Sequence, residues 1–296
     1  MAIWPAIGES GLRYTVEILM APKTFAQYEQ EGWQRNAATY DAIDLPTTCQ
    51  AVTPILNSLG SLQDLPILEL ASGTGYLAAQ AVTQGATITG IDISPKMVEI
   101  AQQRVPVGAT FLLGDASDLP FEAEQFDAVV CSFGFPHFAD PQKALQEIAR
   151  VLKPDGVLTF SIWPEPEPDN SFFGLIQKVC QTYADLEVGL PPAPPSSALA
   201  DPAIRDPMIT QAGFKDIHTQ TLNLRWPLQG PETMVEFIVK GSVRTRMLYE
   251  RQTPAVQAKI RAGLVEETMA YIRNGKKSIP CPGMLVIGSK AVVRMD

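Results

Sequence analysis

The chain has 296 residues, of which 46% are hydrophobic and 19% are charged, and its formal net charge is −9. This composition excludes an intrinsically disordered protein, and the length suffices for one large α/β core with additional elements. The negative charge argues against nucleic acid or an anionic membrane surface as the main partner. The sequence has no apolar stretch of the roughly 20 residues that a membrane span needs, and no signal-peptide pattern. We therefore predict a cytoplasmic protein.

Cysteine and histidine usage argues against a disulfide framework and against a metal site. The four cysteines lie far apart without a C-x-x-C pair, at Cys49, Cys131, Cys180 and Cys281. This spacing favours free thiols in a reducing compartment. The only two histidines, His137 and His218, are too few and too separated for a metal cluster.

The amino-terminal part divides near Met20. Residues 1–19 have no clear periodic pattern, and translation from Met20 would leave that segment out of the physiological chain. Aromatic and small residues then recur at helical spacing, at Phe25, Tyr28, Trp33, Ala37 and Tyr40. This pattern predicts a helix, whose aromatic residues either close a pocket or only pack. A further helix begins at Leu45 and leads toward the first strand.

The first predicted strand carries the most informative motif. Ile67–Leu70 is apolar apart from Glu69, and it passes through the small-residue turn Ala71–Gly75 into a predicted helix, Tyr76–Val82. Such a strand–turn–helix unit lets a ligand approach the backbone closely. The run from Gly73 also fits the dinucleotide fingerprint G-x-G-x-x-G/A, so by itself the motif leaves the ligand open.

The next three predicted strands also end on small or acidic residues. Thr87–Ile91 is followed by Asp92, Thr110–Leu113 by Gly114-Asp115-Ala116, and Phe126–Cys131 by Ser132-Phe133-Gly134. In a doubly wound sheet, these strand ends line one crevice. A carboxylate after the second strand suits a ribose, which offers two hydroxyl donors. Alternatively, these acidic residues only form turns or cap helices.

The later elements continue the alternation and then interrupt it. A helix over Pro141–Leu152 and a turn over Lys153–Gly156 lead to a fifth strand, Val157–Trp163. Proline runs then mark a surface excursion around a helix, Phe172–Ala184. The remaining predicted elements are a helix over Pro202–Ala212, a strand over Ile217–Trp226, an all-helical insertion over Pro231–Asn274, and a last strand over Met284–Val293.

Over residues 65–163 the sequence resembles the class I S-adenosylmethionine (SAM)-dependent methyltransferases, especially the small-molecule group with the ubiquinone/menaquinone-type enzymes. The matching runs are Glu69–Gly75, Gly90–Ser94, Gly114–Ala116, Leu119–Phe121, Phe126–Val130 and Leu152–Thr159. The resemblance implies an α/β fold with a doubly wound, seven-stranded, mostly parallel sheet. It also implies a helical amino-terminal cap within residues 1–45 and a SAM-binding domain over residues 46–296. Insertions 164–202 and 231–275 depart from the family pattern, and we expect them to form a substrate lid.

One position departs from the family pattern. Ala71 stands where the family usually has glycine, and Ser72 where it often has cysteine. Because the added methyl group of Ala71 restricts φ, we expect a wider turn or a negative φ at this position.

The resemblance also implies a SAM site. In it, Tyr40 would reach the SAM carboxylate, Asp92 would accept the ribose hydroxyls, and Asp115 would accept the adenine amino group. The remaining residues expected around SAM are Glu69, Ala71, Ser72, Gly73, Thr74 and Gly75 at the methionine end, Ile93, Met97 and Ala116 at the adenine, and Ser132 and Phe133 beside the sulfonium. Met97 alternatively belongs only to the core.

The predicted reaction is transfer of a methyl group from SAM to an O, N or C nucleophile of a small, apolar or aromatic molecule, without a metal. A general base helps when the nucleophile must lose a proton, and His137 is the candidate because it follows Ser132–Gly134 at the crevice mouth. A structural histidine that caps the helix near Asp140 is the alternative role. A nicotinamide-dependent oxidoreductase and a non-catalytic SAM-binding protein are the alternative functions, and the chain could form a homodimer.

Overall fold

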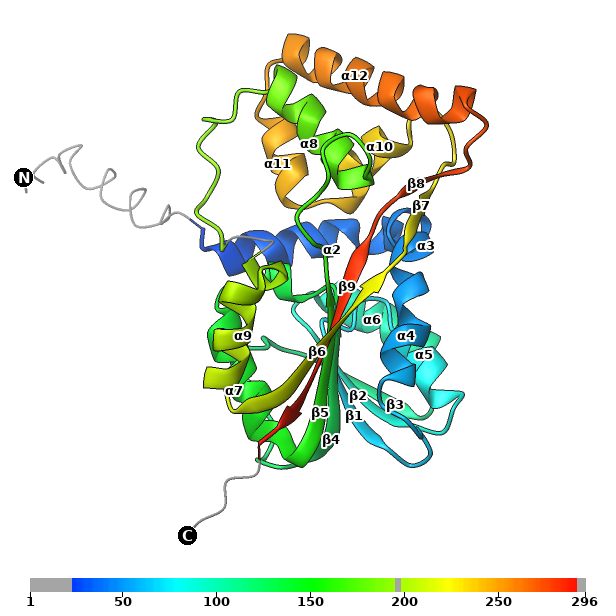
Figure 1. Cartoon of the computed structure of the whole chain (residues 1–296). Helices are drawn as coiled ribbons and strands as arrows, with labels where there is room; N and C mark the ends of the chain where they lie inside the picture. Colours follow the sequence, from blue (N-terminus) through cyan, green and yellow to red (C-terminus); the bar gives the residue numbers. More distant parts are fainter. Residues whose placement is uncertain (1–22, 195–197, 292–296) are drawn as a thin grey trace, which may run out of the picture.

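The computed structural model describes residues 23–194 and 198–291, in which a seven-stranded sheet lies beneath a layer of helices (Figure 1). The predicted segment 1–19 and the predicted start at Met20 lie outside the described residues. The strand order in the sheet is β3-β2-β1-β4-β5-β9-β6. These strands are β1 (Pro66–Leu70), β2 (Thr87–Asp92), β3 (Ala109–Leu113), β4 (Phe126–Ser132), β5 (Leu152–Ile162), β6 (Phe214–Leu222) and β9 (Gly283–Lys290).

The sheet confirms the predicted fold class. Strands β1 to β5 pair in parallel, whereas β9 is antiparallel to both of its neighbours, β5 and β6. The order reverses between β1 and β4, which places a topological switch point there. The carboxyl ends of these strands should therefore border a ligand-binding crevice.

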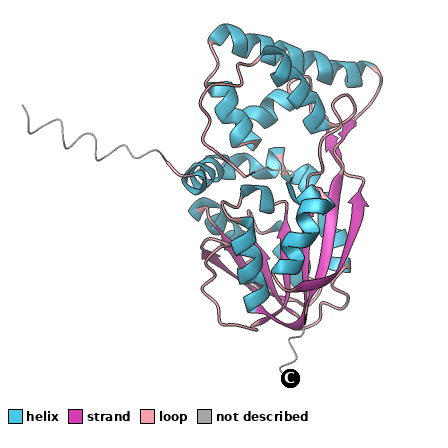
Figure 2. Ribbon diagram, turned by 60° about the vertical axis from the view of Figure 1, so that its left-hand side comes forward, coloured by secondary structure: helices cyan, strands magenta, loops and turns pink. Residues whose placement is uncertain are grey.

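Helices cover both faces of this sheet (Figure 2). One face carries α4 (Val52–Asn57), α5 (Tyr76–Val82) and α6 (Pro95–Arg104), and the other carries α7 (Pro141–Val151) and α9 (Pro202–Gln211). Between α3 (Leu45–Thr48) and α4, the short helix η1 (Cys49–Ala51) interrupts the helical stretch that was expected to run without a break.

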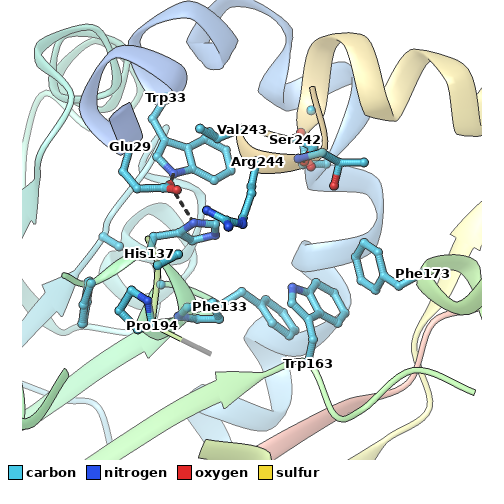
Figure 3. Close-up of a pocket in the computed structure, with 18 of the residues that line it drawn as sticks. Glu29, Trp33, Phe133, His137, Trp163, Phe173, Pro194, Ser242, Val243 and Arg244 are labelled. Carbon is cyan, nitrogen blue, oxygen red and sulfur yellow. Dashed lines mark hydrogen bonds and ion pairs between the residues drawn. The ribbon is translucent and has the colours of Figure 1, made fainter. Parts of the chain in front are cut away.

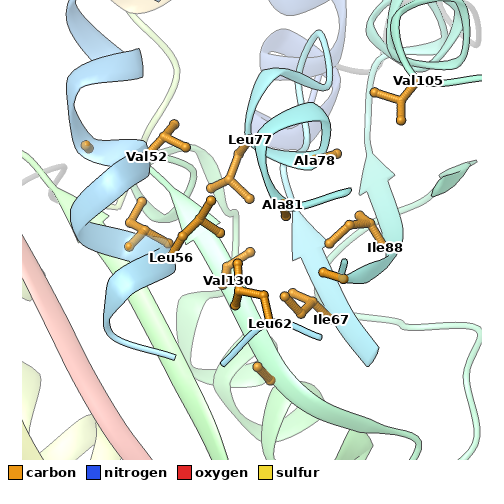
Figure 4. Close-up of a cluster of buried hydrophobic side chains, with 14 of the residues drawn as sticks. Val52, Leu56, Leu62, Ile67, Leu77, Ala78, Ala81, Ile88, Val105 and Val130 are labelled. Carbon is orange, nitrogen blue, oxygen red and sulfur yellow. The ribbon is translucent and has the colours of Figure 1, made fainter. Parts of the chain in front are cut away.

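Alternate residues of β1 supply both cores, because successive side chains of a strand point to opposite faces. Ile67 packs with Leu56 and Leu77 beneath α4 and α5 (Figure 4), whereas Leu68 and Leu70 belong to the cluster beneath α7. Each fully buried aliphatic side chain contributes about 1.5–3 kcal/mol of transfer free energy. The two clusters thus hold the switch point between them.

The upper helical layer, which we call the helical cap, is separate from the amino-terminal cap predicted within residues 1–45 and has a core of its own. It consists of α8 (Phe172–Tyr183), α10 (Thr233–Glu236), the π-helical turn η4 (Phe237–Gly241), α11 (Arg244–Glu250) and α12 (Pro254–Arg273). Buried apolar side chains from these elements pack together, among them Phe172, Leu175, Met234, Ile238, Ile260 and Leu264.

Helix α2 (Phe25–Ile43) lies between the sheet and the helical cap (Figure 1). The Asn36 side chain donates from Nδ2 to the Gly241 carbonyl in η4, at 3.0 Å. The Gln34 side chain accepts through Oε1 from the backbone N–H of Lys96 in α6, at 2.9 Å. Helix α2 therefore contacts both layers through specific hydrogen bonds.

The predicted strand Ile217–Trp226 needs correction. The sheet strand β6 ends at Leu222, and Trp226 belongs instead to β7 (Arg225–Pro227), which pairs antiparallel with β8 (Ser278–Pro280) in a separate ribbon. The Trp226 ring stacks on Phe172 with the ring centroids 3.9 Å apart. The alternating pattern thus continues across two sheets, because the chain leaves the first sheet to bury this tryptophan in the helical cap.

Two smaller boundaries also differ from prediction. The predicted turn Lys153–Gly156 is part of β5, whose pairing with β4 shifts register between Phe126 and Ala128. The last strand, β9, ends at Lys290, and Val293 lies outside the described residues.

Two further short helices are η2 (Phe135–His137) and η3 (Ala198–Ala200). No helix within the described ranges combines the length and apolar character needed to cross a bilayer.

Candidate active site

A cavity of about 830 Å³ lies between the strand ends and the helical cap (Figure 3). Its size falls within the range of roughly 300–1,000 Å³ that is typical of ligand sites. Many of the predicted site residues line it together: Tyr40, Ala71, Gly73, Asp92, Ile93, Met97, Asp115, Ala116, Ser132, Phe133 and His137. A smaller adjoining recess adds Glu69, Ser72 and Thr74.

The turn after β1 has left-handed backbone at several positions. The φ angle is +50° at Ala71, +52° at Gly73 and +77° at Gly75. The negative φ that was one expectation for Ala71 is therefore wrong. A non-glycine residue in this region costs on the order of 1–2 kcal/mol. Room for the extra methyl group exists because Gly134 has no Cβ: an added Cβ there would lie 2.6 Å from the Ala71 Cβ.

Two glycines of this turn have different surroundings. A Cβ added at Gly73 would meet no atom within 4 Å, so the backbone here borders open space in the cavity wall. A Cβ added at Gly75 would lie 2.9 Å from the Ala101 Cβ of α6. Gly75 therefore faces a helix and lines neither the cavity nor the recess.

Asp92 joins the turn after β1 to the start of α6. Its Oδ2 accepts from the Gly73 backbone N–H at 2.9 Å, and its Oδ1 accepts from the Ser94 backbone N–H at 2.9 Å. Burial raises the pKa of the Asp92 carboxyl, and the hydrogen bonds from Ser94 and Gly73 oppose that rise. A carboxylate oxygen can accept more than one hydrogen bond, so this residue retains acceptor capacity at the cavity wall.

Glu69 has an unpartnered oxygen in the recess. Its side chain is 2% exposed, and within the described residues neither its Oε2 nor the Ser72 Oγ has a hydrogen-bond partner. Burial, reinforced by the nearby Asp92 charge, raises the pKa of Glu69 to about 8. A buried acceptor of this kind fits a ligand that brings a positively charged donor, as the ammonium group of SAM would.

The raised pKa of Glu69 predicts a pH dependence of stability. The folded chain binds this proton more tightly than the unfolded chain, so the resulting stability is complete below the unfolded pKa of 4.5 and is lost as the pH rises to about 8. We expect Glu69→Gln and the wild type to have the same free energy of unfolding near pH 4. At pH 8 the free energy of unfolding of Glu69→Gln should be higher by an amount on the order of a few kcal/mol. Melting curves across this range check it, and parallel profiles for the two proteins would contradict it.

His137 pairs with a glutamate that sequence reasoning missed. The Nδ1 of His137 lies 2.9 Å from Oε2 of Glu29, a residue of α2 that is only 3% exposed. The same oxygen accepts from the indole N–H of Trp33 at 3.1 Å, and the Trp33 and His137 rings meet edge to face (Figure 3). The carboxylate thus fixes the orientation of the imidazole at the cavity wall.

The alternative role for His137, capping the following helix, is filled by another residue. Asp140 caps α7, because its Oδ1 accepts from the Lys143 backbone N–H at 2.9 Å. The only sequence signal for Glu29 was its position four residues before Trp33 on an aromatic helix face.

Aromatic side chains form the wall opposite α2. Phe133, which follows β4 with a φ of +57°, stacks on Trp163 at a centroid distance of 3.8 Å. Phe173 meets Trp163 edge to face at 4.9 Å. Trp226 and Phe237 also line the cavity. These rings offer flat apolar surface to a planar ligand.

Three other predicted residues already have protein partners. The Tyr40 hydroxyl lies 3.3 Å from the Thr48 Oγ1, and burial raises the pKa of this phenol. Thr74 donates through Oγ1 to the Asp41 carboxylate of α2 at 2.7 Å. Asp115 accepts from both the backbone N–H and the hydroxyl of Ser117 at 2.8 Å. These contacts shape the cavity wall and tie α2 to the turn after β1.

The described residues bring no three histidine, cysteine, aspartate or glutamate side chains together in a way that could hold a metal ion. All four cysteines are free thiols.

Comparison with known proteins assigns the central part of the chain. Residues 68–160 match the family model described as "Methyltransferase domain". The demethylmenaquinone methyltransferase of Thermus thermophilus is 42% identical over 118 residues, which are 38% of this chain and 53% of that protein. The one from Clavibacter sepedonicus is 38% identical over 124 residues, covering 40% of this chain and 48% of that protein. The chain thus spans about half the length of these curated relatives.

A solved structure shares the fold over a longer stretch. The YcgJ protein of Bacillus subtilis superposes with a TM-score of 0.55 and 21% identity, over 82% of this chain and 98% of that one. At this identity the likeness concerns the fold alone. Residues 68–160 thus match a methyltransferase domain, and the chain is similar over 38–40% of its length to demethylmenaquinone methyltransferases.

Proposed function

We propose that this protein transfers a methyl group from SAM to an O, N or C nucleophile of a small, apolar or aromatic molecule. One observation carries the proposal: a single cavity is bounded by the strand-end residues on one side and by aromatic side chains on the other. Such an arrangement can hold two ligands against each other. Holding reactants in line is the main task of a catalyst for this reaction.

The strand ends would bind SAM. Glu69 and the Ala71–Gly73 backbone would hold the methionine end, Asp92 the ribose, and Asp115 and Ala116 the adenine. The unpartnered Glu69 oxygen and the open space beside Gly73 support this assignment. Bound SAM supplies an activated methyl group, so the protein's main tasks are alignment and exclusion of water.

His137 would act as the general base for an acceptor that carries a hydroxyl proton. With Nδ1 bonded to Glu29, its Nε2 is the nitrogen that would accept that proton. Glu29 would act through His137, because it fixes the tautomer and the ring orientation. This pairing supports base catalysis without requiring it for N or C acceptors.

The helical cap and α2 would cover the acceptor. Phe237 of η4 and Leu248 of α11 line the cavity, whereas Met234 and Leu264 are buried in the core of the cap. We propose that insertions 164–202 and 231–275 form a substrate lid, and that residues within 1–45 add the amino-terminal cover. A lid excludes water and shapes the acceptor site.

A transfer assay tests the proposed function. The protein is incubated with methyl-labelled SAM and a panel of phenols, quinols, amines and thiols, and labelled product is measured beside SAM affinity by calorimetry. The panel includes a demethylated naphthoquinol, because the names of the curated relatives point to such an acceptor. Transfer to at least one acceptor is the expected result. SAM binding without transfer would instead support a binding protein, and preference for a nicotinamide dinucleotide would support an oxidoreductase.

A further inference from the structure

We propose that the acceptor carries an acidic group, a carboxylate or a similar oxyanion, which binds to Arg244 in the cavity. The inference rests on the proposed function and deepens it, because it names the chemical class of the acceptor. The class is a planar apolar or aromatic acid.

Arg244 supplies a positive charge to the cavity wall. It is the first residue of α11, and among the described residues that line the cavity it is the only arginine or lysine. Its Nη1 donates to the Pro191 carbonyl at 2.9 Å. Glu29, Asp44, Asp92 and Asp115, which also line the cavity, form no ion pair with it among the described residues. The guanidinium has five N–H donors in all, so most of its donors remain for a ligand.

Four acidic residues of the cavity wall have surroundings that do not include an ion pair with Arg244. Glu29 bonds His137 and Trp33, and Asp92 bonds the Gly73 and Ser94 backbones. Asp115 accepts from Ser117. Asp44 lies near the Arg246 charge, and burial raises the pKa of its carboxyl, which favours the neutral form. The ion pairs between described residues join none of these four carboxyl groups to Arg244.

The position of Arg244 suits an acid bound across the cavity. Figure 3 shows its side chain extending from the cap side toward His137 and Trp33, while Phe133 and Trp163 lie on the opposite side. An acceptor ring on the Phe133–Trp163 stack could direct its acidic group to Arg244. Planar guanidinium groups bind carboxylates and other oxyanions through two parallel hydrogen bonds.

The chain offers a matched control for this arginine. Arg251 donates through Nη1 to the Gly189 carbonyl at 2.6 Å, in the same loop that holds Pro191, but it does not line the cavity. Arg251→Gln therefore removes a comparable anchor of the loop without removing the cavity charge. Arg244→Lys keeps the charge and removes the planar fork.

The test compares phenolic acids with their methyl esters and primary amides. Each acid, its ester and its amide are titrated against the protein with bound S-adenosylhomocysteine. The same compounds are assayed for methyl transfer with SAM. In the wild type, we expect the acid to bind and react at least tenfold better than its ester. Arg244→Gln should weaken acid binding and raise KM by about 10- to 100-fold, the range expected for a charged hydrogen bond. Arg244→Gln should change the affinity and the KM of the ester by no more than about threefold. Arg251→Gln should change neither quantity by more than that for the acid or the ester.

Several results would overturn the inference. Equal use of acids and esters by the wild type would do so, as would a preference for amines. An equal loss for both ligands in Arg244→Gln, matched by Arg251→Gln, would assign Arg244 to loop anchoring. The proposed function fails separately: if acids bind through Arg244 but no acceptor is methylated, the acid site stands and methyl transfer does not.

Discussion

Replacing His137 with Gln is expected to lower methyl transfer to a phenol or alcohol by roughly 10²- to 10⁴-fold, the usual contribution of a general base. The amide has no basic nitrogen to accept the proton from the nucleophile, although its size is similar. SAM affinity should stay within about threefold, because the imidazole is bonded to Glu29 of α2 and the turn Ala71–Gly75 keeps its contacts. Single-turnover rates and calorimetry measure the two quantities separately.

A series of acceptors separates base catalysis from a structural role. For phenols that are already ionised at the assay pH, such as nitrophenols, no proton remains to be removed, and the loss in His137→Gln should nearly vanish. Glu29→Gln should give a smaller loss of rate, which should again be larger for neutral phenols than for ionised ones. The imidazole remains in this variant, but its tautomer is no longer fixed by a carboxylate. A loss of equal size for ionised and neutral phenols would show that His137 only shapes the cavity.

The sheet could be predicted from sequence because its signals are local. Strands β1, β2 and β4 are short apolar runs that end on acidic or small residues, and each is followed by a helix with apolar residues on one face. The right-handed crossovers of such units then determine a parallel sheet. For the same reason, the sequence predicts that the residues after these strands lie together at one crevice.

The parts that prediction missed depend on contacts between distant positions. Glu29 and His137 are separated by 108 positions, and no periodic pattern reports such a pair. Leu222, Leu224 and Trp226 alternate as buried residues, but this alternation does not show that the chain changes sheets after Leu222. A negative φ was one of the two expectations for Ala71, and the space beside Gly134 that admits its methyl group at positive φ forms only in the folded chain.

Gly73→Asn should reduce SAM affinity by about 10- to 100-fold while the protein stays folded. Gly73 has a φ of +52°, and asparagine tolerates this left-handed region better than other residues with a side chain. The new side chain would extend into open space at the cavity wall, where the methionine end of SAM is proposed to lie. A steric conflict of this size typically costs 1–3 kcal/mol, which corresponds to the expected loss in affinity.

Gly60 provides the control for this substitution. It also has a positive φ, of +75°, with no atom within 4 Å of an added Cβ, but it does not line the cavity. Gly60→Asn should therefore keep SAM affinity and match the melting temperature of Gly73→Asn to within a few degrees. If both variants bind SAM as the wild type does, the cofactor does not pass beside Gly73. If Gly73→Asn alone melts much earlier, its loss of binding reflects the backbone, and the milder Gly73→Ala then decides by affinity whether the added atom meets SAM.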